Sequence, residues 1–169
     1  MGVLSLQYSF RQSLRAPARA AYAWCTDFGP GDGKLFSEPT RRSVRQLSED
    51  ALVMTDTTYP RGRPLRIRRL VRLNPDTMAW TNSHLNGPYR YSQYWYRIVS
   101  DGPLRSHLEF HGLRLERVRH PVSAADKVLR AEQCRRIDSD EWRRRLAPAL
   151  ERDLTPQTIK SRLMSQRPR

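Results

Sequence analysis

Residues 65–85, LRIRRLVRLNPDTMAWTNSHL, contain two candidate strands joined by a short turn. In the first strand, 65–73, apolar side chains alternate with arginines, as in a strand with one buried face. The turn NPDT, 74–77, is so short that the second strand, 78–85, must run antiparallel to the first. Arg69 breaks the alternation, because it falls on the apolar face, where a charge is costly unless another group compensates it.

The pattern of short strands and short turns continues on both sides of this hairpin. Four further strands are predicted over residues 42–48, 51–59, 89–99 and 105–118. The connections SED, PRGRP, NGP and DGPL are rich in turn-forming residues and too short for anything but antiparallel neighbours. Residues 4–14 also alternate apolar and polar side chains, which predicts a first strand ahead of this meander.

Helical signals precede and follow the strands. Residues 16–28, APARAAYAWCTDF, place Pro17 near a first helical turn and predict a short helix. Residues 29–39, GPGDGKLFSEP, are rich in turn formers and can hold one more helical turn. After residue 120 the pattern becomes helical again, and SAAD at 123–126 predicts a capping box.

A long amphipathic helix is predicted over residues 138–154, DSDEWRRRLAPALERDL, with an expected kink at Pro148. Asp138 and Glu141 form a second candidate capping box. Apolar residues recur every four positions on one face of this helix: Trp142, Leu146, Leu150 and Leu154. The chain is therefore predicted to form a single domain over residues 1–155, and residues 156–169 are expected to be a basic tail that extends the helix or frays.

The charge of the chain leaves two interpretations open. Its 31 lysines and arginines outnumber 17 acidic residues, which gives a formal net charge of +14. Such a surface suits nucleic acid or another acidic partner, but it also suits surface ion pairs. Arg66, Arg68 and Arg72 form an outward stripe, and RRR at 143–145 adds charge on the helix. No nucleic-acid motif accompanies them, and stacking aromatics on the same face would strengthen that interpretation.

The compartment is inferred from absences. Cys25 and Cys134 are the only cysteines, and their spacing fits neither a metal site nor a redox motif. The N-terminus MGVLSLQYSF lacks the charged and apolar regions of a signal peptide, and no run approaches the roughly 20 apolar residues of a membrane span. A cytoplasmic protein that is not integral to a membrane is expected.

The order of strand, helices, six-stranded meander and long C-terminal helix resembles the helix-grip fold of the START and pollen-allergen-like superfamily (SRPBCC). Local matches are SLRAPARAAYAWCTDF at 13–28, the hairpin YSQYWYRIVSDGPLRSHLEFHG at 91–112 and the helix W-x-x-x-L-x-x-x-L-x-R-D-L at 142–154. The superfamily also holds polyketide cyclases and dehydrases and lipid-transport proteins. The resemblance covers roughly residues 4–155 and implies an α+β fold, in which a curved seven-stranded antiparallel sheet wraps around the C-terminal helix, with one or two short helices after the first strand.

The resemblance also implies a cavity between sheet and helix that can take an apolar ligand. If the NPDT turn pairs Leu73 with Met78, Arg69 faces Asn82, and His84 follows at the same polar end. If the PRGRP loop pairs Tyr59 with Leu65, Thr55 lies opposite Arg69 on its other side.

Arg69 has two interpretations. Its guanidinium could hold the carboxylate or phosphate of an amphipathic ligand through a two-pronged bond. Alternatively, a bulge turns the side chain outward, or it forms an internal ion pair with Asp56 or Glu109.

The aromatic run YRYSQYWY at 89–96 allows two registers. Either Tyr94, Tyr96 and Ile98 face inward, or Tyr91, Trp95 and Val99 do. A three-residue NGP turn, which would set Tyr94 against Trp80, favours the first. The predicted ligand contacts are a polar group and an apolar wall: Arg69, Asn82 and His84, with Trp80, Tyr94, Tyr96, Phe110, Trp142 and Leu146.

The remaining motifs give no metal site, no cofactor and no catalytic constellation. His107, Glu109 and His111 share a strand face and could in principle hold zinc, but Leu108 and Phe110 are the better inward set, which places the histidines on the solvated outer face. The function predicted is binding or carriage of a hydrophobic or amphipathic small molecule, such as a lipid, quinone or polyketide-like compound. The alternatives are a polyketide cyclase/aromatase-like enzyme, in which His84 with Tyr94 or Arg69 would shuttle a proton, and an RNA- or ribosome-associated basic protein.

Overall fold

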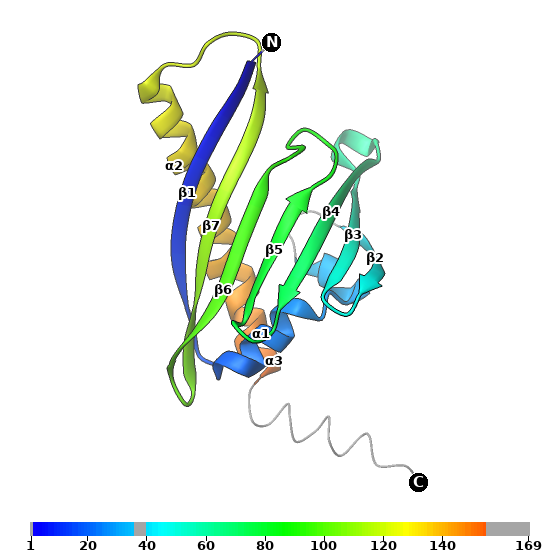
Figure 1. Ribbon diagram of the computed structural model, residues 1–169, viewed down its shortest axis with the longest axis vertical. Helices are drawn as coiled ribbons and strands as arrows, with labels where there is room; N and C mark the ends of the chain where they lie inside the picture. Colours follow the sequence, from blue (N-terminus) through cyan, green and yellow to red (C-terminus); the bar gives the residue numbers. More distant parts are fainter. Residues whose placement is uncertain (1, 36–39, 155–169) are drawn as a thin grey trace.

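Seven strands form one antiparallel sheet in the order β1-β7-β6-β5-β4-β3-β2 (Figure 1). The computed structural model describes residues 2–35 and 40–154, so the predicted tail lies outside the described residues. The strands have the following bounds: β1 Gly2–Leu14, β2 Arg41–Ser48, β3 Ala51–Thr58, β4 Leu65–Asn74, β5 Ala79–His84, β6 Gln93–Gly102 and β7 Arg105–Val118. The predicted seven-stranded antiparallel sheet is confirmed.

The helices lie on one face of the sheet, behind it in Figure 1. A short helix and a 3₁₀ turn follow β1, and a long helix with a π-helical turn in its middle ends the described chain. Their bounds are as follows: α1 Ala18–Thr26, η1 Pro30–Lys34, α2 Ala124–Glu141, η3 Trp142–Leu146 and α3 Ala147–Asp153. A second 3₁₀ turn, η2, covers Pro60–Gly62 between β3 and β4. No helix among the described residues is both long and apolar enough to cross a membrane.

The C-terminal helix begins earlier than its apolar pattern indicates. Ser123 caps α2, since its hydroxyl accepts from the backbone N–H of Asp126 at 3.0 Å and donates to that residue's carboxylate at 2.7 Å. Asp138 and Glu141 lie within the continuous helix, so the second predicted capping box is wrong. The π-helical turn η3 falls just before Pro148, which has no N–H to donate to the preceding turn and so disturbs the helix at the expected place.

The pairing of β4 with β5 differs from the prediction by two residues. Arg69 pairs with His84 and not with Asn82, because Met78 adopts a positive φ of 51° and extends the turn, so that β5 starts one residue later than predicted. A shift of two keeps every side chain on its face, since strand side chains alternate with period two. The predicted inward set therefore survives the wrong register.

The pairing of β3 with β4 differs from the prediction by one residue, which has a larger consequence. Thr58 and not Tyr59 pairs with Leu65, because the chain leaves β3 into the 3₁₀ turn η2. Met54 thus lies opposite Arg69, and the prediction for Thr55 is wrong, because that residue faces away from the helices. Asp56 takes the inward position that follows Met54.

Strand β6 has the inward face that the NGP argument favours. Ile98 is buried, and Tyr94 and Tyr96 pack against the core. Tyr96 faces Trp80, where Tyr94 was expected, because the turn runs through residue 92 and includes Tyr91 at a positive φ of 73°. The strand consequently starts at Gln93 and not at residue 89.

Candidate functional site

A cavity of about 470 Å³ lies between the inner face of the sheet and the helices. Its size falls in the range of small-molecule sites. All nine residues predicted as ligand contacts line it: Arg69, Trp80, Asn82, His84, Tyr94, Tyr96, Phe110, Trp142 and Leu146. That they contact a ligand stays a prediction.

Aromatic rings form much of the cavity wall. Trp80 on β5 and Tyr96 on β6 are stacked, with ring centroids 4.8 Å apart and planes within 1° of each other. Phe110 on β7 meets the ring of Tyr96 edge-on at 5.1 Å. Trp142 and Leu146 contribute the helix side, because the π-helical turn directs both toward the sheet. Flat, rigid rings of this kind offer a large apolar surface at a low cost in side-chain entropy.

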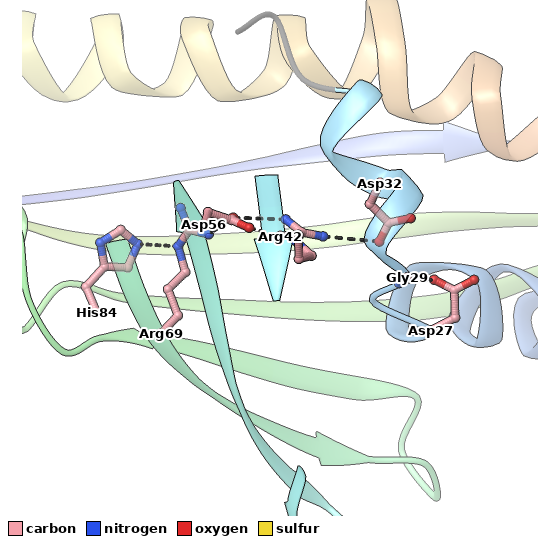
Figure 2. Close-up of polar contacts among 7 residues, drawn as sticks. All are labelled: Asp27, Gly29, Asp32, Arg42, Asp56, Arg69 and His84. Carbon is pink, nitrogen blue, oxygen red and sulfur yellow. Dashed lines mark hydrogen bonds and ion pairs between the residues drawn. The ribbon is translucent and has the colours of Figure 1, made fainter. Parts of the chain in front are cut away.

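The polar end of the cavity is a chain of paired charges (Figure 2). Arg42 on β2 holds Asp56 with two hydrogen bonds, Nε to Oδ1 at 2.8 Å and Nη2 to Oδ2 at 3.0 Å, and its Nη1 reaches Asp32 at 3.1 Å. Arg69 Nη1 donates to Asp56 Oδ2 at 2.5 Å, and Arg69 Nε donates to His84 Nε2 at 3.1 Å. Burial would raise the pKa of Asp56, but the two guanidinium groups outweigh burial and hold it below its usual value.

This arrangement shows which internal partner Arg69 has. Its guanidinium points inward and is neutralised by Asp56, which is one of the two internal partners that the sequence offered. The internal ion pair with Asp56 is therefore confirmed, and contact of Arg69 with an anionic ligand stays a prediction. Two of its five N–H groups are committed to Asp56 and His84, and the rest of the guanidinium stays next to the cavity.

His84 is neutral, and its tautomer is fixed by Arg69. The N–H of Arg69 Nε can only donate, so His84 Nε2 must accept and the ring proton must sit on Nδ1. Burial, followed by the positive charges of Arg69 and Arg114, lowers the pKa of His84 to about 3. The Nδ1–H group is buried and has no hydrogen-bond partner. A buried donor without a partner is costly, so a ligand acceptor here would relieve a penalty that already exists.

Asn82 offers the complementary group two residues along the same strand face. Its Oδ1 is buried and unpartnered, while its side chain hydrogen-bonds the phenol of Tyr96. Burial raises the pKa of Tyr94 to about 12, so this phenol is also protonated near neutral pH. The polar end thus presents one free acceptor and one free donor on neutral side chains, beside a compensated ion-pair chain.

A second polar cluster lies on the helix side of the cavity. Tyr8 donates to Asp138 Oδ2 at 2.6 Å, and burial raises the pKa of Asp138. Arg114 stacks over the ring of Tyr89 with its guanidinium carbon 3.7 Å from the ring centroid. The first contact ties β1 to α2, and the second ties β7 to the turn between β5 and β6.

Comparison with known proteins matches the architecture to solved structures. No protein-family model and no curated protein matches the sequence. The Zhui aromatase/cyclase from Streptomyces sp. R1128 superposes with a TM-score of 0.72 at 13% identity, over 90% of this chain and 98% of that one. A START superfamily protein from Mycobacterium smegmatis gives 0.64 at 14% identity, over 87% and 98%. Norcoclaurine synthase from Thalictrum flavum gives 0.57 at 9% identity, over 83% and 98%.

The chain has a helix-grip fold. The grip is the curved sheet, and the gripped element is the helix made by α2, η3 and α3. The fold predicted from the order of strands and helices is confirmed, and the cavity occupies the space that the grip leaves between sheet and helix.

The charged cluster of this helix-grip cavity, which consists of Asp56, Arg42 and Asp32, is not predicted as a cluster by the sequence. Asp56 falls on the same face as Leu52 and Met54 at period two, and that signal could have placed it inward. Arg42 pairs with Asp56 across the β2–β3 hairpin, but its strand is otherwise exposed and shows no apolar face. Asp32 comes from η1, whose approach to β2 depends on tertiary contacts that no local pattern reveals.

The outer face of the helix-grip sheet differs from the prediction at one histidine. His107 points outward but is only 5% exposed, because Asp101 binds its Nδ1 at 2.8 Å and Arg11 contacts its Nε2. Glu109 lies 3.6 Å from the same ring, while His111 is exposed. Among the described residues, no three His, Cys, Asp or Glu side chains are placed to share a metal ion.

Proposed function

We propose that this protein binds and carries a hydrophobic or amphipathic small molecule in the cavity. One observation supports the proposal above the others: an aromatic wall ends in a buried donor on His84 and a buried acceptor on Asn82, neither of which has a partner. A ligand with an apolar body and one polar head would cover the rings and satisfy both groups.

The head group is neutral and hydroxyl-like. A hydroxyl can donate to Asn82 Oδ1 and accept from His84 Nδ1–H, whereas a carboxylate can only accept. The arginines at this end are already compensated by Asp56 and Asp32, so an added anion would gain little net attraction. Phenols, enols and alcohols on a planar or alicyclic body form the ligand class that fits.

Binding is favoured over catalysis by the basicity of His84. A general base is most effective when its pKa lies near the working pH, and a His84 pKa of about 3 makes the ring a weak base at pH 7. Cyclisation of a linear poly-β-ketone is the second candidate, supported by the likeness to the aromatase/cyclase fold and by the hydrogen-bonded Arg69–His84 pair. If wild type forms a cyclised product and His84→Ala does not, although the variant still binds the ligand, the result would favour the cyclase candidate.

Three naphthalene ligands test the proposal, because they share a body and differ in the head. Quenching of tryptophan fluorescence at pH 7.5 should show that 2-naphthol binds more tightly than 2-methylnaphthalene, by roughly fivefold or more for one recovered hydrogen bond. It should also bind more tightly than 2-naphthoate. Equal affinities for all three would show that the polar end is not used.

A matched pair of variants locates the bound head. Asn82→Ala should reduce the preference for naphthol over methylnaphthalene, because only the bond from His84 remains, while keeping the binding of methylnaphthalene. Ser83→Ala, on the same strand but facing outward, is the control and should leave both affinities unchanged. If the two variants behave alike, the head does not contact Asn82.

A further inference from the structure

The outer face of the sheet carries a groove that the cavity does not explain. In Figure 1 this face is turned toward the viewer and the helices lie behind it. The groove crosses five neighbouring strands, from β4 through β5, β6 and β7 to β1. Its central residues are Arg72, Thr81, Trp95, His111 and Ser9.

Strand pairing places these five residues in one row. Arg72 pairs with Thr81, Thr81 with Trp95, Trp95 with His111, and His111 with Ser9. Adjacent strands lie about 4.8 Å apart, so the row extends over roughly 19 Å. A second row runs beside it and adds polar side chains: Ser83, Gln93 and Gln7, with Leu70 at the β4 end and Leu113 between Gln93 and Gln7.

The middle of the groove is aromatic. Trp95 is half-buried on this face, and its ring centroid lies 5.2 Å from that of His111. Both rings lie outside the hydrophobic core, which occupies the other face of the sheet. Exposed rings on a sheet are stacking platforms for unpaired bases, and the neighbouring amide and hydroxyl groups of Gln93 and Ser83 can hydrogen-bond base edges.

Arginines without ion pairs border the groove. Arg66, Arg68 and Arg72 are exposed on β4, and Arg97 is exposed on β6. Across the described part of the chain, no ion pair involves the guanidinium groups of these four. The arginines at 143–145 differ, since each lies within 4 Å of a helix carboxylate. These four arginines thus place unpaired positive charge beside the aromatic pair.

We propose that this outer groove binds single-stranded nucleic acid. Bases stack on Trp95 and His111, and the arginines of β4 and Arg97 contact phosphates. A duplex keeps its bases stacked and hidden from such rings, and an acidic polypeptide would gain nothing from them, so the combination favours an unpaired strand. The groove lies on the opposite face from the cavity and does not depend on the proposed ligand.

Fluorescence anisotropy with a labelled single-stranded oligonucleotide of about 12 nucleotides and mixed sequence tests the groove. Trp95→Ala should weaken binding by at least about fivefold, the loss of one stacked base. Arg72→Ala should reduce the slope of log K against log salt by about 0.7, the value for one phosphate contact on a single strand. Arg19→Ala, an exposed arginine of α1, is the matched control and should leave the affinity within twofold.

Trp95→Phe keeps a stacking ring and should retain most of the wild-type affinity that Trp95→Ala loses. The double variant Arg68→Glu with Arg72→Glu should abolish binding, and it tests the groove independently if Trp95→Ala folds poorly. Unchanged 2-naphthol binding or an unchanged Tm shows that each variant is folded. The proposal is overturned if the oligonucleotide does not bind at 50 mM salt, if Trp95→Phe is as weak as Trp95→Ala while both are folded, or if Arg19→Ala weakens binding as much as Arg72→Ala. Tighter binding of a duplex, or of polyglutamate, overturns it as well.

Discussion

Replacement of Asp56 by asparagine should destabilise the protein more than any other single charge removal at the cavity. Asp56 is 5% exposed and accepts hydrogen bonds from two guanidinium groups. Asparagine keeps the shape of the side chain but removes the charge that compensates Arg42 and Arg69. The side chain of Arg42 is 4% exposed, so water cannot take the place of the carboxylate.

The magnitude follows from the burial of the partners. Breaking a buried ion pair by removing one member costs about 3–5 kcal/mol, because the other charge stays buried and uncompensated. Asp140→Asn on α2 is the surface control, since its partners Arg143 and Arg144 are 62% and 69% exposed. That substitution should cost less than about 1 kcal/mol.

Urea unfolding at pH 7 followed by circular dichroism measures both losses. The pKa of Asp56 is lowered in the folded state, so its contribution is present above its unfolded value of about 4 and is lost as the pH falls through the folded value. The difference between wild type and Asp56→Asn should therefore shrink below about pH 4. A loss under about 1 kcal/mol at pH 7, no larger than that of Asp140→Asn, would refute the view that the ion-pair chain is buried and coupled.

Three further predictions concern the pH response, the helix cap and the cavity wall. The pKa of His84 is about 3 in the folded state, so between pH 7 and pH 5 only the unfolded state takes up a proton at this residue. The free energy of unfolding should therefore fall by about 2 kcal/mol over this range. His84→Gln should flatten this part of the plot of urea midpoint against pH. Ser123→Ala should cost about 1 kcal/mol in urea unfolding, and a negligible loss would show that the cap is not formed in solution. Phe110→Ala should lower stability by about 3–5 kcal/mol in the same assay, and a loss under 1 kcal/mol would contradict its full burial.

The face of each strand residue could be predicted more reliably than its partner. Alternation predicts the inward position of Phe110, because burial of one face fixes side-chain parity where the apolar pattern is strong. For Tyr94 and Tyr96 alternation allows both faces, and the short NGP turn favours the inward one, which the structure has. The strand partner of each residue depends on the geometry of the connecting turn. Met78 and Tyr91 adopt the left-handed backbone conformation in these turns, and the sequence gives no sign of it because neither residue is a glycine or asparagine. The predicted β4–β5 and β5–β6 registers are therefore wrong by two residues, but the predicted inward residues keep their face.

The charged part of the site was predicted incompletely for a different reason. Thr55 was placed inward by a turn argument that was wrong by one residue, and this displaced Asp56 from the face it occupies. The start of α2 is predicted by the capping box at 123–126 and confirmed by the Ser123 cap. Apolar periodicity gives little signal there, because Val128, Leu129 and Ile137 are exposed. Apolar periodicity predicts a helix only through its buried face, so the signal is weak where most side chains of a helix are exposed.

Native mass spectrometry tests the central claim most directly. The full chain, incubated with a small-molecule extract of its source cells and desalted, should retain one neutral hydroxylated molecule that is released on denaturation and can be identified. Leu146→Trp, which fills the cavity from the helix side, should retain no small molecule after desalting while keeping its fold. If wild type also retains no small molecule, or if the variant retains the same molecule in the same amount, the cavity is not the binding site.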